Sequence, residues 1–156
     1  MQPPCLNQVW RLSKEGGLSV FVSVNDPSGL SFDAAGNLYG SSWSDGAVYK
    51  YSPTGQLLET PVSGLPADSR PYGVAIDGAG NLYVAGYGSA YDSASQIFKV
   101  TPSGVMSVFL SPPLPNGAPA SLVFDGAEIY TLGTTTALTS CGSLPIDPMS
   151  LSQVAG

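Results

Sequence analysis

The sequence contains no histidine among its 156 residues. Histidine is the usual general base near neutral pH and activates serine or cysteine in most nucleophilic triads. It is also a common ligand of zinc and copper. The two cysteines, Cys5 and Cys141, are too few to close a structural zinc site. Histidine-based hydrolysis and the common zinc centres are therefore excluded.

Charge is scarce, and most of it is negative. Charged residues make up 10% of the chain, with five Lys and Arg against 11 Asp and Glu, which gives a net charge of −6. Globular domains usually carry about 25% charged residues. An acidic surface repels phosphate backbones, so we expect no nucleic-acid partner. No apolar run reaches the roughly 18 residues of a membrane-spanning helix, so we expect no membrane partner.

The N-terminus has no basic region followed by an apolar stretch, so the sequence shows no secretory signal. Few lysines and many serines, threonines and glycines suit an extracytoplasmic protein. The sequence does not fix the localisation.

Turn-forming residues are abundant instead. The chain has 19 Gly and 14 Pro, while 43% of its residues are hydrophobic. This composition argues against a helical bundle, because Gly and Pro are the poorest helix formers. It leaves enough apolar material for a packed core.

One pattern occurs three times, beginning at Pro27, Pro71 and Pro119. The second copy reads Pro-Tyr-Gly-Val-Ala-Ile-Asp-Gly-Ala-Gly-Asn-Leu-Tyr-Val. Between these copies falls a second pattern, Val-Trp-Arg from Val9, Val-Tyr-Lys from Val48 and Ile-Phe-Lys from Ile97. In each case a Gly-containing turn and a short apolar run follow. Repeats at this spacing are typical of solenoids and propellers.

Each repeat predicts four antiparallel strands. The apolar runs have strand chemistry, Asp-x-x-Gly-Asn closes a hairpin, and the Pro-x-Gly after the third strand forms a second tight turn. In the second repeat the strands are a (Gly73–Asp77), b (Leu82–Ala85), c (Gln96–Val100) and d (Val105–Leu110). Four-stranded units at this period predict an all-β fold, a β-propeller built from four-stranded antiparallel blades.

The repeated Pro-x-Gly, Asp-x-x-Gly-Asn and Leu-Tyr-Val elements resemble the NHL-repeat propellers. They are also similar to the wider group that includes SMP-30/gluconolactonase-like and streptogramin lyase-like proteins. The resemblance extends over about residues 9 to 133 and implies a blade of a commonly six-bladed ring. It implies little about function, because many unrelated activities share the fold.

The strand order along the chain is c-d, a-b-c-d, a-b-c-d, a-b. A propeller segment over 1–133 therefore contains a half-blade (9–24), two blades (27–62 and 71–110) and a second half-blade (119–133), followed by a non-repeat tail (134–156). Propellers close with four to eight blades. Three blade equivalents thus imply missing blades, or a second copy whose a-b strands complete the c-d strands of the first.

The repeat register places both cysteines in the loop between strands b and c, where two half-blades would meet. A Cys5–Cys141 disulfide across that boundary is one hypothesis, and two separate thiols are the other.

Three recurring residue types have structural interpretations. Asp33, Asp77 and Asp125 recur in the a–b turn, where a turn role is more economical than a calcium site, since calcium takes six to eight oxygens. Basic residues recur in strand c, where their stems can lie on neighbouring rings; they are Arg11, Lys50 and Lys99. The aromatic residues that precede them point to the opposite face and are core candidates; they are Trp10, Tyr49 and Phe98.

Non-repeating residues collect in the b–c and d–a connections, which lie at one end of a propeller around the channel mouth. The ligand-binding candidates there combine aromatic rings, carboxylates and one arginine; they are Trp43, Asp45, Arg70, Tyr72, Tyr87, Tyr91 and Asp92. The d–a connections also hold Asn25, Asp26, Asp68 and Asn116. Such a set suits a protein or a small, polar or sugar-like ligand.

Two functions remain. The first is a binding or scaffolding module without a cofactor. The alternative is a metal-dependent lactone hydrolase of the SMP-30/gluconolactonase kind, with a divalent metal such as calcium or zinc. The glutamates Glu15, Glu59 and Glu128 do not lie where the resemblance places that family's acidic ligand, and streptogramin lyase-like catalysis relies on histidine. Both departures favour a binding module without a recognisable catalytic set.

Overall fold

The computed structural model describes residues 7–66, 69–87, 95–111, 118–134 and 151–154. This part of the chain consists of antiparallel strands joined by turns, and it includes no helix of the length and hydropathy needed to cross a membrane. The all-β prediction is confirmed.

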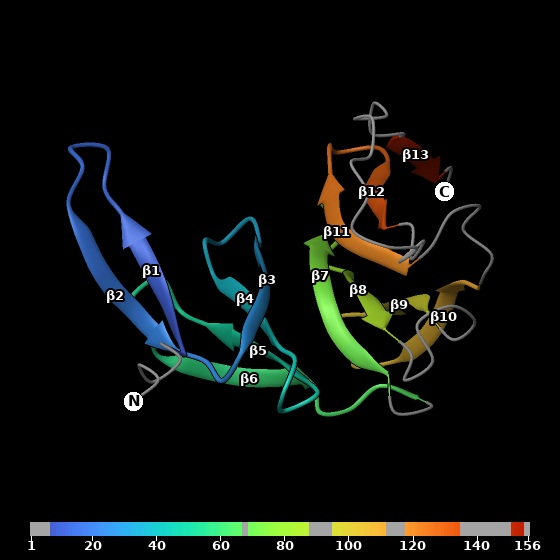
Figure 1. Ribbon diagram of the computed structural model, residues 1–156, viewed down its shortest axis with the longest axis horizontal. Coiled ribbons are helices and arrows are strands. Elements are labelled where there is room, and N and C mark those ends of the chain that lie inside the picture. Colours follow the sequence, from blue (N-terminus) through green and yellow to red (C-terminus); the bar gives the residue numbers. More distant parts are fainter. Residues whose placement is uncertain (1–6, 67–68, 88–94, 112–117, 135–150, 155–156) are drawn as a thin grey trace, which may run out of the picture.

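The strands form four sheets, one after another along the chain (Figure 1). The first pairs β1 (Gln8–Leu12) with β2 (Leu18–Ser23). The second has the order β3 (Pro27–Phe32), β4 (Leu38–Ser42), β5 (Ala47–Tyr51), β6 (Leu57–Val62). The third repeats this order with β7 (Arg70–Ile76), β8 (Leu82–Tyr87), β9 (Gln96–Val100) and β10 (Met106–Leu110). The fourth holds β11 (Ala118–Phe124), β12 (Ile129–Thr134) and β13 (Leu151–Val154).

The predicted strand order is confirmed, with one addition. The segment after residue 134 contributes β13, which pairs antiparallel with β12 from Ile129↔Val154 to Leu132↔Leu151. The sequence showed no repeat there, whereas the structure places β13 where strand c lies in the complete blades. The fourth sheet therefore has three strands.

The core lies between successive sheets. Val48 and Val62 of the second sheet pack against Val84 and Phe98 of the third. Ile97 of the third sheet packs in one cluster with Leu122 and Ile129 of the fourth. Val9, Val22 and Leu38 join the two-stranded sheet to the second. Face-to-face packing of this kind is what blades of a propeller require.

Glycine lets the innermost strands approach each other. A Cβ on Gly73 of β7 would lie 2.6 Å from the Ala120 carbonyl oxygen of β11, and one on Gly29 of β3 would collide with the Tyr72 carbonyl oxygen. The Ser41 hydroxyl fixes the second approach, since it accepts from the Gly29 N–H at 2.8 Å and donates to the Tyr72 carbonyl. The Pro-x-Gly element at the start of the first two repeats thus serves blade-to-blade packing.

The recurring basic residues lie on aromatic rings, as predicted. Lys50 lies 5.2 Å from the centre of the Tyr39 ring, and Lys99 lies 5.5 Å from that of Tyr83. In each pair the tyrosine is the cross-strand neighbour on strand b. Among the described strands only β2 pairs with β1, and Arg11 lies 5.9 Å from the ring of Phe21 on β2.

The prediction of core aromatics holds only in part. Phe98 is fully buried and Tyr49 is half-buried, but the side chain of Trp10 is 44% exposed. The expectation for Trp10 was wrong because β1 and β2 have no inner strands and no preceding sheet to cover that face.

Candidate functional site

The b–c and d–a connections meet at one end of the sheets, which we call the loop face. The connections on this face that are described in full or in large part comprise residues 24–26, 43–46, 63–66 and 69. They join β2 to β3, β4 to β5 and β6 to β7. The Trp43 N–H donates to the Asp26 carbonyl at 3.0 Å, so the first two connections are held together by a backbone hydrogen bond.

Three aromatic rings gather on this face at the boundary between the second and third sheets. The centre of the Trp43 ring lies 6.0 Å from that of Tyr72 and 5.8 Å from that of Tyr87, and the two tyrosine rings are 5.4 Å apart. Interplanar angles of 90°, 61° and 53° are those of edge-on and tilted contacts. We call Trp43, Tyr72 and Tyr87 the aromatic cluster. Its members are partly exposed, so ring surface remains available to a ligand.

Arg70 of the third sheet holds the loop of Trp43, which belongs to the second sheet, in place. Its guanidinium Nη1 donates to the Ser44 carbonyl at 3.1 Å and to the Trp43 carbonyl at 3.5 Å. Arg70 begins β7 and pairs with Tyr87 across the sheet. It therefore holds the Trp43 loop against the strands that carry both tyrosines.

Asp26 adds a carboxylate beside the cluster. Asp26, Ser28, Trp43 and Tyr72 line a hollow of about 340 Å³. The Asp26 backbone has a φ of +47°, the one left-handed non-glycine conformation among the described residues. Asp tolerates this conformation better than most residues, and such strain concentrates at functional sites. The carboxylate accepts a hydrogen bond from Ser44 Oγ at 3.1 Å.

Asp45 lies in the same loop as Trp43 but points to a different polar network. Its carboxylate accepts from Asn25 Nδ2 and from the Tyr49 hydroxyl, both at 3.0 Å. The hydrogen bonds from Asn25 and Tyr49 lower the pKa of Asp45. Burial, together with the hydrogen bond to Asp45, raises the pKa of Tyr49. Asp45 therefore stays ionised at neutral pH.

A smaller hollow of about 140 Å³ is lined by Asp45, Ser69 and Arg70. The Ser69 hydroxyl is buried and has no hydrogen-bond partner within the described ranges. A buried hydroxyl without a partner is unfavourable unless something else satisfies it.

The structure thus brings together four of the predicted residues, Trp43, Arg70, Tyr72 and Tyr87, with Asp45 on the adjoining side of the same loop. Tyr91 and Asp92 lie outside the described residues, as do Asp68, Asn116 and both cysteines, Cys5 and Cys141. Three residues that line the larger hollow, Asp26, Pro27 and Ser28, were not among the predicted ligand-binding set. Asp26 stood only in the wider set of connection residues, and Ser28 was missed. Ser28 lies between Pro27 and Gly29 and so occupies the position that Tyr72 has in the next repeat. This equivalence to a predicted residue could have identified Ser28 from the sequence.

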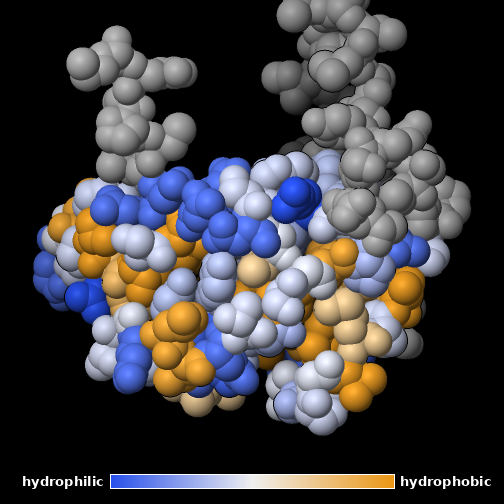
Figure 2. Space-filling model, turned by 90° about the horizontal axis from the view of Figure 1, so that it is seen from below, coloured by the Kyte–Doolittle hydropathy of each residue, from blue (hydrophilic) through white to orange (hydrophobic). Residues whose placement is uncertain are grey.

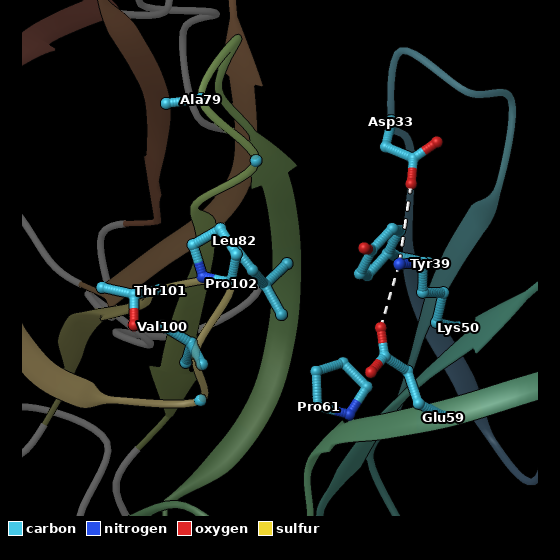
Figure 3. Close-up of a pocket in the computed structure, with 12 residues that line it drawn as sticks. Asp33, Tyr39, Lys50, Glu59, Pro61, Ala79, Leu82, Val100, Thr101 and Pro102 are labelled. Atoms are coloured by element: carbon cyan, nitrogen blue, oxygen red, sulfur yellow. Dashed lines mark hydrogen bonds and ion pairs between the residues drawn. The ribbon is translucent and has the colours of Figure 1, made fainter.

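The opposite end of the sheets holds a separate groove of about 320 Å³ between the second and third sheets (Figure 3). Lys50 lies on the wall formed by the second sheet, 2.9 Å from a Glu59 carboxylate oxygen and 3.9 Å from one of Asp33. Thr101 and Pro102 face it from the other sheet. Hydrogen bonds to Tyr39 and Glu59 raise the pKa of Lys50. Since the charge of Lys50 is matched inside the chain, we place the candidate site at the loop face.

The recurring aspartates have the turn role that the sequence suggested. Asp77 accepts from the Ala79 and Asn81 N–H groups at 3.0 and 2.8 Å, and Asp33 repeats this geometry with Ala35 and Asn37. The described residues contain no group of three or more Asp, Glu, Cys or His side chains that could hold a metal ion.

The comparisons with known proteins agree on the fold. A family model described as a beta-propeller repeat matches residues 62–92. A chain of a nidogen/laminin complex has 20% identity and a TM-score of 0.66, over 82% of this chain and 50% of that one. Virginiamycin B lyase from Staphylococcus aureus has 17% identity and a TM-score of 0.61, over 96% of this chain and 48% of that one. A gluconolactonase from Xanthomonas campestris has 19% identity and a TM-score of 0.62, over 86% and 44%.

No curated protein sequence matches the chain significantly. The chain spans about half the length of these solved structures. At such identities the similarity concerns the fold. The chain is a partial β-propeller, similar in fold to the propellers of the nidogen/laminin complex, virginiamycin B lyase and gluconolactonase.

Proposed function

We propose that this chain is a propeller binding module that recognises a protein or a small polar ligand through its loop face. The observation that carries the proposal is the aromatic cluster beside the hollow lined by Asp26 and Ser28. Aromatic faces with a few convergent polar groups are the usual composition of a ligand site.

Each part of the site has a chemical task. The exposed surfaces of Tyr72 and Trp43 offer apolar contact to a ring or to an aliphatic stem. The Asp26 carboxylate accepts hydrogen bonds from hydroxyl or amino groups. The Ser69 hydroxyl in the adjoining hollow offers one further donor. This combination suits sugars and polar peptide side chains.

The known propellers leave both ligand classes open. One similar chain was solved in a nidogen/laminin complex, which supports a protein partner for a propeller of this fold. The hollow of about 340 Å³ has the size of a small-ligand site. The lactone-hydrolase alternative has support from gluconolactonase-like neighbours, but no observation in the described residues assigns it a metal-binding group.

Isothermal titration calorimetry with a panel of mono- and disaccharides and short polar peptides tests the proposal. At least one probe should bind, and Trp43→Ala should weaken that binding about tenfold or more, as loss of an aromatic anchor does. Leu58→Ala is the matched control, because Leu58 is an exposed hydrophobic side chain near the start of the outer strand β6, away from the loop face. Equal losses in both variants, or no binding by any probe at millimolar concentration, would contradict the small-ligand form of the proposal.

A further inference from the structure

We propose that a second copy of this chain completes the ring, with β11 and β12 of each copy inserted as the inner strands of the β1–β2 sheet of the other. This inference goes beyond the loop-face proposal and does not depend on it. It rests on a comparison of equivalent positions within the chain.

The ladder registers define which positions are equivalent. Leu30, Val74 and Leu122 occupy the same place in β3, β7 and β11, as judged by their partners on the neighbouring strand. Val74 is 2% exposed because the second sheet covers it, whereas Leu30 is 50% exposed. Phe32 is exposed in the same way, although its equivalent Ile76 is buried. The face of β3 thus has the apolar character of an inter-sheet contact, and the described residues leave it largely uncovered.

The other end of the chain shows the complementary opening. Val123 of β11 is the equivalent of Ala75 in β7, through the pairs Val123↔Tyr130 and Ala75↔Tyr83. Ala75 is 1% exposed between sheets, while Val123 is 59% exposed. In a closed ring Val123 of one copy faces Leu30 of the other, as Ala75 faces Leu122 within the chain.

The β1–β2 sheet, which corresponds to the outer half of a blade, also has apolar side chains that are exposed. Trp10, Leu12 and Leu18 are exposed, and their equivalents in the third sheet, Phe98, Val100 and Met106, pack into a core between sheets. On the face drawn in Figure 2, hydrophobic residues form several exposed groups with polar residues between them. When β11 and β12 of a second copy are inserted beside β1, Trp10 lies against the third sheet of that copy. This contact buries the face of the β1–β2 sheet that carries Trp10.

Charge and ring contacts favour a second copy as the occupant. In both complete blades a lysine on strand c lies over the tyrosine opposite it on strand b. Arg11 is the equivalent cation on β1 and lacks that tyrosine, and Tyr130 on β12 is the equivalent tyrosine. Asp125, in the turn before β12, matches the place of Asp33, which lies 3.9 Å from Lys50. The acidic turn of one copy therefore meets the arginine of the other.

The lengths also agree. The chain covers 48% of virginiamycin B lyase and 50% of the similar chain in the nidogen/laminin complex. Two copies together therefore have about the length of one such propeller.

Closure requires one strand to move. Within one copy β13 pairs with the edge of β12 that strand c takes in a complete blade. The partner's β1 and the chain's own β13 are alternatives for this edge. We therefore expect the backbone amides of Gln8–Leu12 to gain protection from hydrogen exchange on dimerisation, and those of Leu151–Val154 to lose it.

Sedimentation velocity of interface variants tests the head-to-tail arrangement. Leu30→Lys and Val123→Lys should each raise the dimer dissociation constant at least about tenfold, because each places an unpaired charge in the buried contact. Leu58→Lys is the matched control, because Leu58 on the outer strand β6 is 49% exposed with sheets on both sides of its blade. An equimolar mixture of the two interface variants should regain part of the dimer, since such a ring has one unmodified contact.

Three outcomes would overturn the proposal. The unmodified chain could remain monomeric at all concentrations, as when further blades or another protein cover the open faces. Only Leu30→Lys could weaken the dimer, which would mean that this face packs against itself. Residues 151–154 could keep their protection in the dimer, which would exclude the strand exchange.

Discussion

At the scale of single residues, Asp77 shows how one side chain closes a hairpin between two core strands. Its carboxylate accepts from two backbone N–H groups, from Asn81 Nδ2 at 2.7 Å and from the Tyr83 hydroxyl at 3.2 Å. Burial alone would raise the pKa of Asp77, but these hydrogen bonds hold it below the ordinary value of 3.8. The ionised form is therefore favoured in the folded state.

Asp77→Ala should lower the free energy of unfolding by about 1–2 kcal/mol at pH 7, because it leaves turn donors without their acceptor. A group with a depressed pKa stabilises the fold above its unfolded pKa and loses that contribution as the pH falls through its folded pKa. The difference between wild type and variant should thus shrink below about pH 4. Urea unfolding at several pH values measures it.

Asp125→Ala provides the comparison, because Asp125 accepts from the Ala127 and Glu128 N–H groups without a matching Asn. Asp125→Ala should lower the free energy of unfolding by less than Asp77→Ala does. Equal effects, or a loss at Asp77 that stays constant down to pH 2, would contradict the assigned turn role.

The aspartate turns could be predicted because one residue type at one spacing has a local role that does not depend on the rest of the fold. Trp10 could not be placed in this way. Its alternation with Arg11 indicated an inward side chain, but whether an inward side chain is buried depends on the neighbouring strands, and among the described residues the sheet of Trp10 has only two. The aromatic cluster lies between these cases, since the repeat register placed its members on one face and only the structure showed their contacts.

At the scale of strands and turns, the Pro-x-Gly element brings the innermost strands into contact. Gly73 is buried between β7 and β11, and a side chain there would meet backbone atoms, which cannot rotate away. Gly78 lies in the adjacent turn with open space around it.

Gly73→Ala should destabilise the fold by about 1–3 kcal/mol, the usual effect of overpacking, since β7 and β11 must separate to accept the methyl group. Gly78→Ala should change stability by no more than about 0.5 kcal/mol. Thermal unfolding of both variants by circular dichroism makes the comparison. A loss at Gly78 as large as that at Gly73 would contradict the packing account.

The sequence predicted the strands of the repeats well, and strand c of the second repeat was placed at its observed bounds, Gln96–Val100. It did not predict β13, because Leu151–Val154 carries neither the repeat pattern nor a turn signal. That strand is defined by pairing with the free edge of β12, and an edge is a property of the sheet.

At the scale of the whole molecule, the sheets form an arc rather than a closed ring (Figure 1). The loop face lies at the same end of the strands in successive sheets, so closure by a second copy would place two aromatic clusters around one channel mouth. The two predicted half-blades were the feature of the sequence that most clearly indicated missing blades or a second copy. The structure adds which apolar faces are open and which residues are their counterparts.

The most direct test is the solution mass of the unmodified chain, measured by light scattering after size exclusion. A closed two-copy ring predicts about 32 kDa, twice the 16.0 kDa of one chain. If that mass is found, repeating the run with reductant shows whether a Cys5–Cys141 bond contributes to the assembly. A stable species of 16.0 kDa at all concentrations would contradict closure by a second copy.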